Sequence, residues 1–297
     1  MSTIYTHIEQ NKRQSIVTVV LFVLFVSLIG FFFDTFYGES GLFYTGFALI
    51  VAGLSAFFSY YNSDKIVLAI SRAKRVLPEE NERLHNLVEN MSIASGIPKP
   101  RIYMIEDTAM NAFATGRDPE HAVICFTSGI VNFLEKRELE GVIAHEMSHI
   151  GNRDILFMSL VSVLVGSVTL LAYLFTHGRL YRSRRSSRST SVHPIFFIIG
   201  LVLVLLSPII AELIKLAIGR KREYLADSTA ALITRYPQGL ASALRKLSYD
   251  REILEAANGA TAHLYITSPL RSGGSRLSVL FNTHPPTGER IARLEAM

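Results

Sequence analysis

The sequence predicts an α-helical integral membrane protein, with about four transmembrane helices and an attached α+β domain. The 297-residue chain is 49% hydrophobic, with a mean hydropathy of +0.30. Only 19% of its residues are charged, below the quarter or so that is usual in soluble domains. Four apolar runs are each long enough to cross a bilayer, and two segments outside them mix strand and helix patterns.

The first two apolar runs predict a transmembrane hairpin over residues 16–61. The polar N-terminus, residues 1–15, leads into the run Ile16–Phe33, and Leu42–Tyr61 follows after a short acidic loop. Because no small-residue cleavage site follows the first run, we interpret it as a retained anchor and not as a signal peptide. Basic residues flank the hairpin at both ends, so the positive-inside rule predicts that both ends are cytoplasmic.

Residues 62–154 are expected to form the first half of the α+β domain. A helix over residues 78–95 begins near a proline and ends at a glycine. Strands are predicted at Arg101–Ile105, Asn111–Thr115 and His121–Phe126, and a turn rich in Gly and Pro joins the last two. A further helix with one apolar face is predicted to end at Gly151-Asn152.

Residues 155–218 predict a second transmembrane hairpin, and residues 219–297 the second half of the domain. The runs Ile155–Phe175 and Ile195–Ile218 flank loop 177–193, which has five arginines and no acidic residue. Arginines in an outside loop conflict with the positive-inside rule. The length of both runs outweighs this bias, and an arginine-rich turn is costly to bury in a membrane. We therefore expect four spans, with this loop outside and both halves of the domain cytoplasmic.

Charge and cysteine content narrow the function class. The net charge is +5 and the pI about 9.3, which we attribute to basic residues beside membrane spans. No basic module with interleaved aromatic residues is visible, so no nucleic-acid partner is expected. The single cysteine, Cys125, excludes an intrachain disulfide and fits a reducing compartment.

The sequence His145-Glu146-Met147-Ser148-His149 fits the pattern His-Glu-x-x-His. Residues four apart share one face of a helix, so both imidazoles can bind one zinc ion and leave room for a third ligand and a water. Glu146 would then be the general base that takes a proton from this water. The alternative is a surface helix that happens to carry two histidines, but the surrounding apolar segment makes idle polar groups costly.

The third ligand is expected in the second half of the domain. The extended pattern with a nearby third histidine needs Gly at 152 and His at 155, where this chain has Asn152 and Ile155. Glu223 and Asp227 lie four apart on a predicted helix, so one could bind zinc while the other accepts a hydrogen bond from a ligand histidine. A solvated charged face is the alternative, because basic residues precede Glu223.

A strand just before a metal-site helix is a natural edge for an extended substrate peptide. The strand in question is Asn111-Ala112-Phe113-Ala114. An ordinary sheet strand explains these four residues as well.

With these motifs, the chain resembles the HtpX family of membrane-embedded zinc peptidases and, more distantly, the integral-membrane prenyl-protein peptidases. The late segment Thr283-His284-Pro285-Pro286 with Arg290-Ile291 also fits the family. The resemblance implies a zincin-like (gluzincin) domain with Glu223 as third zinc ligand. It implies that Asp227 contacts a ligand and does not bind the metal itself. It further implies that Asn111–Ala114 is the substrate edge and that His284 steadies the oxyanion.

These observations lead us to expect a zinc metalloendopeptidase of the cell (inner) membrane with one Zn²⁺ per subunit. The resemblance implies that it cleaves misfolded or damaged membrane proteins on the cytoplasmic side, as part of membrane quality control. Two alternatives stay open: a peptidase of prenylated C-terminal tails, and a catalytically idle membrane scaffold. The sequence leaves the oligomeric state and the role of loop 177–193 open.

Overall fold

The computed structural model describes residues 4–37, 42–164, 219–258, 261–269 and 285–297. The second predicted hairpin beyond residue 164, its arginine-rich loop 177–193 and the candidate oxyanion residue His284 lie outside these ranges. The predicted count of four spans therefore stays a prediction.

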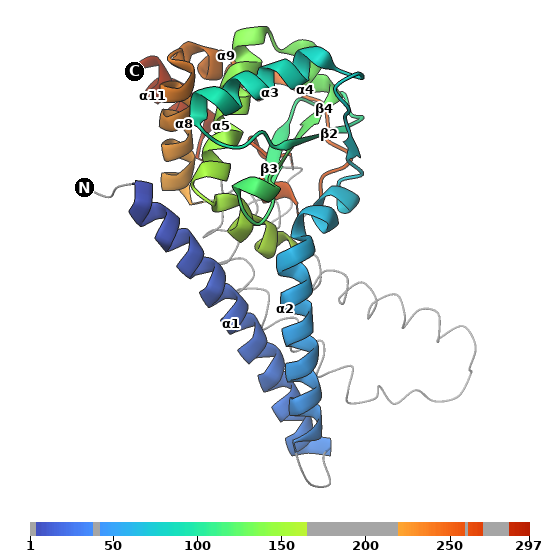
Figure 1. The fold of residues 1–297 in the computed structure, drawn as a ribbon. Coiled ribbons are helices and arrows are strands. Elements are labelled where there is room, and N and C mark those ends of the chain that lie inside the picture. The colour runs from blue at the N-terminus through green and yellow to red at the C-terminus, as the bar shows by residue number, and fades with distance from the viewer. Residues whose placement is uncertain (1–3, 38–41, 165–218, 259–260, 270–284) are drawn as a thin grey trace.

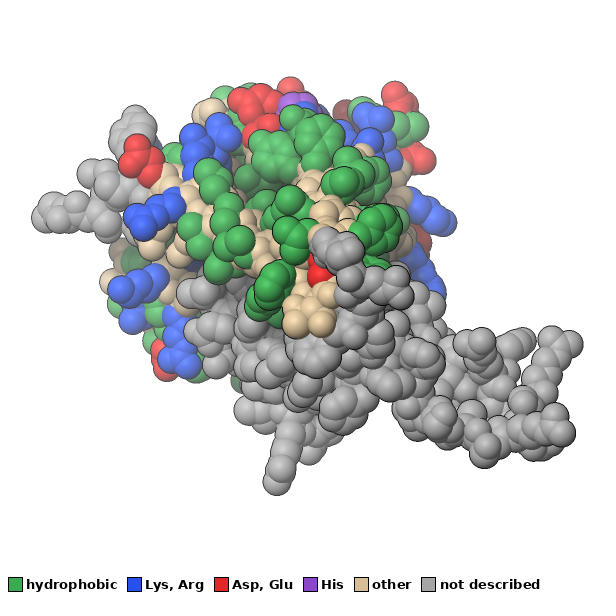
Figure 2. Space-filling view, turned by 90° about the horizontal axis from the view of Figure 1, so that it is seen from below, with side chains coloured by type: hydrophobic (Ala, Val, Ile, Leu, Met, Phe, Trp, Pro, Cys, Tyr) green, Lys and Arg blue, Asp and Glu red, His purple; other side chains and the backbone are tan. Residues whose placement is uncertain are grey.

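Two long helices form the membrane-capable part of the described chain. Helix α1 (Ile4–Tyr37) and helix α2 (Phe43–Ile70) run side by side away from the rest of the fold (Figure 1). Each holds an apolar stretch long enough to cross a membrane, over Ile8–Leu28 and Phe43–Ile70. Seen from below, hydrophobic side chains dominate much of the described surface near the centre, while Lys and Arg lie toward its edge (Figure 2). Helix α1 begins well before the apolar run at Ile16.

A glycine and an aspartate near the end of α1 hold the start of α2 against it. A Cβ atom on Gly30 would lie 2.6 Å from the carbonyl oxygen of Tyr44, so only glycine permits this approach. The Asp34 carboxylate accepts hydrogen bonds from the backbone amides of Tyr44 and Thr45, both at 2.8 Å. Asp34 thereby satisfies amides in the first turn of α2 that have no partner within the helix.

A four-stranded sheet forms the base of the α+β part. Its strands are β1 (Lys74–Arg75), β2 (Arg101–Ile105), β3 (Ala112–Thr115) and β4 (Val123–Thr127), in the order β1-β2-β4-β3. Strands β2 and β4 are parallel, and β3 pairs antiparallel to β4. Strand β3 is thus an edge strand. The three predicted strands are present, and the short β1 was not anticipated.

Helices pack around this sheet, and one of them occupies the centre. They are α3 (Glu82–Ser95), α4 (Ser128–Phe133), α5 (Lys136–Gly151), α8 (Arg220–Thr234), α9 (Pro237–Tyr249) and α11 (Thr287–Glu295), with short 3₁₀ turns at Pro119–His121 and Ala262–Leu264. Helix α5 contacts α3, α8, α9 and β3, and it is buried from Glu138 to Ile150. A Cβ atom on Gly141 would lie 2.7 Å from the amide nitrogen of Leu240, so glycine lets α9 approach α5 closely.

The C-terminal end of helix α2 packs into the core of the domain. Val67, near its end, belongs to a buried cluster with Phe113 of β3 and Tyr265. The rings of Phe113 and Tyr265 meet edge to face, with centroids 5.1 Å apart. A short apolar helix, Asp154–Leu164, adds Phe157 to the same cluster. The membrane-capable hairpin is therefore packed directly onto the sheet beside α5.

Candidate metal centre

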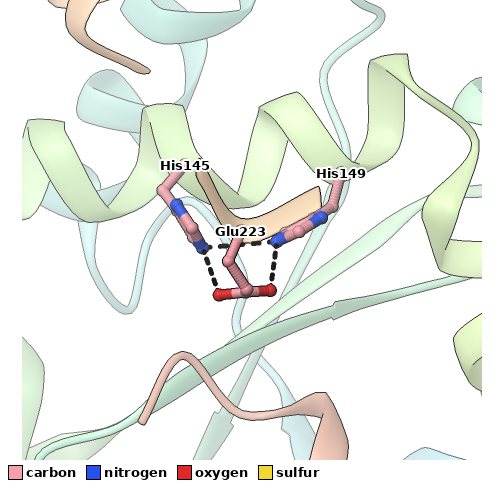
Figure 3. A group of neighbouring side chains, drawn as sticks. All are labelled: His145, His149 and Glu223. Atoms are coloured by element: carbon pink, nitrogen blue, oxygen red, sulfur yellow. Dashed lines mark hydrogen bonds and ion pairs between the residues drawn. The ribbon is translucent and has the colours of Figure 1, made fainter. Parts of the chain in front are cut away.

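Three donor groups meet between α5 and α8. His145 and His149 lie one turn apart on α5, with their Nε2 atoms 3.3 Å apart (Figure 3). Glu223, from α8, places Oε2 at 3.8 Å from His145 Nε2 and Oε1 at 3.5 Å from His149 Nε2. All three side chains are buried. Two imidazole nitrogens and one carboxylate oxygen that converge in this way are a donor set suited to a catalytic zinc ion with an open fourth position.

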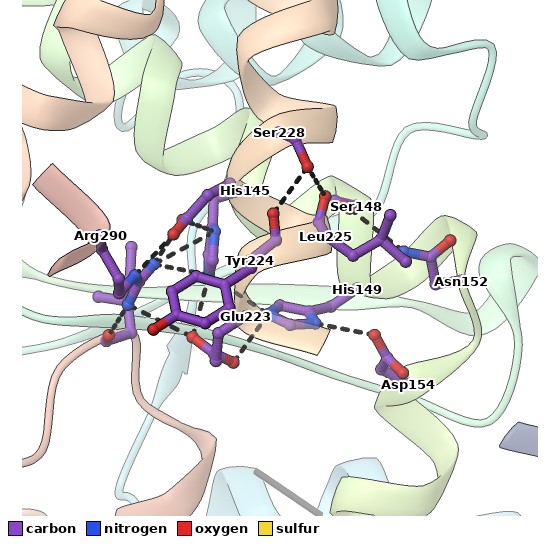
Figure 4. Close-up of polar contacts among 12 residues, drawn as sticks. His145, Ser148, His149, Asn152, Asp154, Glu223, Tyr224, Leu225, Ser228 and Arg290 are labelled. Atoms are coloured by element: carbon purple, nitrogen blue, oxygen red, sulfur yellow. Dashed lines mark hydrogen bonds and ion pairs between the residues drawn. The ribbon is translucent and has the colours of Figure 1, made fainter. Parts of the chain in front are cut away.

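Each histidine is held from behind by its own carboxylate. Asp227 Oδ1 lies 3.0 Å from His145 Nδ1. Asp154 Oδ2 lies 3.0 Å from His149 Nδ1 (Figure 4). A proton on Nδ1 that is donated to a carboxylate leaves the lone pair of Nε2 free for a metal. The Asp227 contact is the one expected from the sequence, whereas Asp154 was not anticipated.

An arginine from α11 links the acidic groups of α8. Arg290 is 1% exposed and donates to both oxygens of Asp227, at 2.9 Å from Nε and 2.7 Å from Nη2. Its Nη1 atom lies 3.3 Å from Glu223 Oε2 and donates to the carbonyl oxygen of Ile266 at 2.9 Å. This buried cation offsets the charge of two carboxylates. Sequence reasoning named Arg290 within a motif but gave it no role.

The buried charges shift the pKa values of the centre in different directions. Burial lowers the pKa of His145 despite the nearby Asp227. Burial would also lower the pKa of His149, but its hydrogen bond to Asp154 and the charge of Glu223 raise it to about 9. Burial raises the pKa of Glu146 to about 7, with a further contribution from Glu223. A carboxylate that titrates near neutral pH is suited to general-base work.

The predicted substrate strand lies beside this centre. Residues Asn111–Ala114 are all buried, and the backbone amide of Ala114 hydrogen-bonds to the Glu146 carboxylate. The carbonyl oxygen of Ala112 accepts a hydrogen bond from the amide of Ile266 at 3.0 Å. The chain's own segment at Ile266 therefore covers part of the free edge of β3.

Of the two further residues that were not anticipated, Asp154 had a signal in the sequence and Arg222 did not. Asp154 follows His149 by five residues, across the helix end at Asn152, which brings it back against the imidazole. Arg222 belongs to the basic run before Glu223 that left a solvated charged face as the alternative interpretation. Arg220 and Lys221 are exposed, but Arg222 turns inward and places Nε 3.5 Å from Asp154 Oδ1.

Comparisons with known proteins agree with this geometry. Residues 78–297 match the model of peptidase family M48. Proteins described as protease HtpX homologs from Dictyoglomus thermophilum and Thermoanaerobacter pseudethanolicus are 41% and 42% identical to the chain. Each alignment covers 99% of this chain, with 95% of the first relative and 98% of the second. The crystal structure of S. mikatae Ste24p superposes with a TM-score of 0.53 at 20% identity, over 97% of this chain and 66% of that one. At this identity the Ste24p likeness concerns the fold.

The fold, the donor cluster and these matches define a membrane-associated metalloprotease. The chain belongs to the HtpX family within peptidase family M48. This confirms the family and the enzyme class expected from the sequence, and two membrane-capable helices agree with a membrane protein.

Proposed function

We propose that this metalloprotease is a zinc-dependent endopeptidase of the cell membrane that cleaves misfolded or damaged membrane proteins on the cytoplasmic side. The observation that carries the proposal is the convergence of Glu223 from α8 with His145 and His149 of the buried helix α5, beside Glu146. Helix α1 of the membrane-capable hairpin contacts the segment that follows α5. A site in this place would be close to substrate polypeptides that lie in the bilayer or emerge from it. Residues 62–154 and 219–297 would together form the peptidase domain.

His145, His149 and Glu223 would hold one zinc ion, and Asp227 would orient His145 through its Nδ1 atom. When bound, zinc lowers the pKa of water and polarises a carbonyl group as a Lewis acid. The three ligands supply one negative charge, from Glu223, so the site would keep a net positive charge toward an incoming carbonyl oxygen.

Glu146 moves the proton in this proposal. Its carboxylate takes a proton from the attacking water and later gives it to the nitrogen of the leaving amine, so the added water ends up shared between the two products. A pKa of about 7 in the metal-free site suits both steps, because the group can be charged for the first and neutral after it. His284 would steady the oxygen of the attacked carbonyl.

Asn111–Ala114 would bind the substrate as an added strand on the edge of β3. Because the Ile266 amide already pairs with Ala112, a peptide would either extend along the remaining edge toward Ala114 or displace this segment. The Ala114 amide, which bonds to Glu146, marks where such a peptide would come closest to the general base.

The test is a Glu146→Gln variant in detergent-solubilised full-length protein. It should keep about one zinc per chain and lose membrane-protein cleavage by roughly 10²–10⁴-fold. Glu140→Gln, on the same helix but paired with Arg137 away from the centre, is the control and should cleave normally. Near-normal cleavage by Glu146→Gln would refute the mechanism.

Two further results would favour the alternatives. Cleavage of a prenylated peptide but not of its unprenylated form would identify a peptidase of prenylated tails. Zinc-loaded wild-type protein that cleaves neither substrate would identify a scaffold.

A further inference from the structure

The first turns of α1, before the apolar run that begins at Ile16, contact the segment that follows α5 and the start of α8. Figure 1 shows the start of α1 near α8. Asn11 is only 5% exposed, whereas its neighbours Gln10, Lys12 and Arg13 are exposed. Ser15, one turn further, is buried on the same face. The buried polar face of α1 therefore packs against the domain, where Asn11 finds polar partners.

Asn11 uses both hydrogens of its side-chain amide on the segment that follows α5. Its Nδ2 atom donates to Asp154 Oδ1 at 2.6 Å and to the carbonyl oxygen of Asn152 at 2.9 Å. The other oxygen of Asp154 lies 3.0 Å from His149 Nδ1. A continuous chain of buried hydrogen bonds therefore runs from α1 through Asp154 to a histidine of the donor cluster.

A second contact joins α1 to the same carboxylate through Arg222. Gln14 accepts a hydrogen bond from Nη2 of Arg222, and Arg222 Nε lies 3.5 Å from Asp154 Oδ1. The Arg222 guanidinium also stacks over the ring of Phe157, 4.9 Å from its centroid. Arg222 immediately precedes Glu223, so α1 also contacts the helix that carries Glu223.

We propose that Asn11 is a positioning residue of the metal centre, which fixes the Asp154 carboxylate so that His149 presents Nε2 to the ion. The inference rests on the proposed zinc site. Asparagine suits the role because its amide gives two donors without adding charge. Asp154 is 1% exposed, so loss of the donor leaves a buried carboxylate oxygen with one partner fewer. Helix α1 is then part of the catalytic unit as well as a membrane anchor.

The experiment measures zinc affinity by competition with a chromophoric chelator, in full-length protein held in detergent. Asn11→Ala should bind zinc about 3–10-fold more weakly, less than the 10–100-fold typical for loss of a group that touches the ligand itself. Asn11→Leu keeps the side-chain size and the apolar helix, and it should lose affinity to the same extent. Gln10→Ala, exposed on the same helix, should match the wild type.

A double-mutant cycle separates positioning from simple docking of the helix. In an Asp154→Ala background, Asn11→Ala should cause no further loss of zinc affinity, because the group that it positions is absent. Unchanged affinity in both Asn11 variants, or a loss that persists in full in this background, would overturn the inference. Wild-type protein that binds no zinc would instead refute the proposed zinc site itself.

Discussion

The two histidines of α5 are one turn apart, yet they are supported from opposite parts of the molecule. His145 rests on Asp227 of α8, which Arg290 of α11 holds with two hydrogen bonds. His149 rests on Asp154, which contacts Asn11 of α1 and Arg222. One half of the centre is thus secured within the domain, and the other half at the junction with the membrane-capable helices.

Under the proposed zinc site, this difference makes one ligand histidine depend on how α1 packs against the domain. The domain-side support consists of a bidentate arginine–carboxylate pair, a rigid and strong arrangement. The membrane-side support combines the longer contact of Arg222 with a neutral amide on α1, whose position depends on how the hairpin packs. We therefore expect changes on the domain side to affect folding and metal together, and changes on the membrane side to affect mainly the metal.

The largest effect should come from Glu223, which both halves share. Glu223→Ala removes the only carboxylate of the three-residue donor cluster in the described chain, so zinc content should fall from about one per chain to near zero, and proteolysis with it. Metal analysis after gel filtration, with casein cleavage in parallel, measures both. If Glu223→Ala keeps its zinc while Asp227→Ala loses it, the roles that we assign to these two residues are reversed.

On the domain side, Arg290→Met should destabilise the fold. It leaves Asp227 and Glu223 buried without their cation, and breaking such a buried pair costs about 3–5 kcal/mol. Denaturant unfolding of the metal-free protein in detergent measures this loss. Arg293→Met, on the same helix but exposed over the ring of Tyr224, should cost far less. Equal stability of the two variants would contradict the domain-side role of Arg290.

The sequence predicted some parts of this centre from spacing and others only from the family resemblance. His145 and His149 are fixed by helical spacing, and the spacing of Glu223 and Asp227 gave a second helix with the right donors. The assignment of Glu223 to the zinc and Asp227 to the support came from family resemblance. The sheet was predictable because its strands are short apolar runs between turn residues, whereas β1 has only two exposed basic residues and no such pattern.

Contacts that depend on tertiary packing were out of reach. Asn11 lies in the polar N-terminus, for which the sequence predicted no packed structure. Helix α1 begins at Ile4, and this places Asn11 on a buried face of the helix. Arg222 stands in a basic triplet, so composition alone suggests solvent. Ile266, which hydrogen-bonds to the edge of β3, belongs to a segment that is distant in sequence from this strand.

The two supporting carboxylates give a direct comparison of the halves. Asp227→Asn and Asp154→Asn should each weaken zinc binding by roughly 10–100-fold, because each replaces the charged acceptor that orients one ligand histidine with a weaker, neutral one. Only Asp227→Asn should also lower the unfolding midpoint of the metal-free protein strongly, since it breaks the bidentate contact with Arg290. The same loss of stability in both variants would remove the distinction between the two sides.

The smallest effect, a change in the pH dependence of zinc binding, separates the two histidines themselves. The pKa of His145 is lowered, so His145 is already neutral at pH 7. The pKa of His149 is raised to about 9, so its imidazole is protonated there and a metal must displace that proton. Zinc affinity should therefore rise about tenfold per pH unit up to about pH 9 and then level off.

Asp154→Asn removes the carboxylate that most strongly raises the pKa of His149, so the pH at which affinity levels off should move downward. Asp227→Asn removes a group that raises the pKa of His145, a residue already neutral over this range, so the levelling point should stay in place. Chelator competition at half-unit steps between about pH 6 and 10 measures both curves. A levelling point that moves only in Asp227→Asn would mean that His145, and not His149, releases the proton, and that the charge balance of the two halves is the reverse of the one inferred from their contacts.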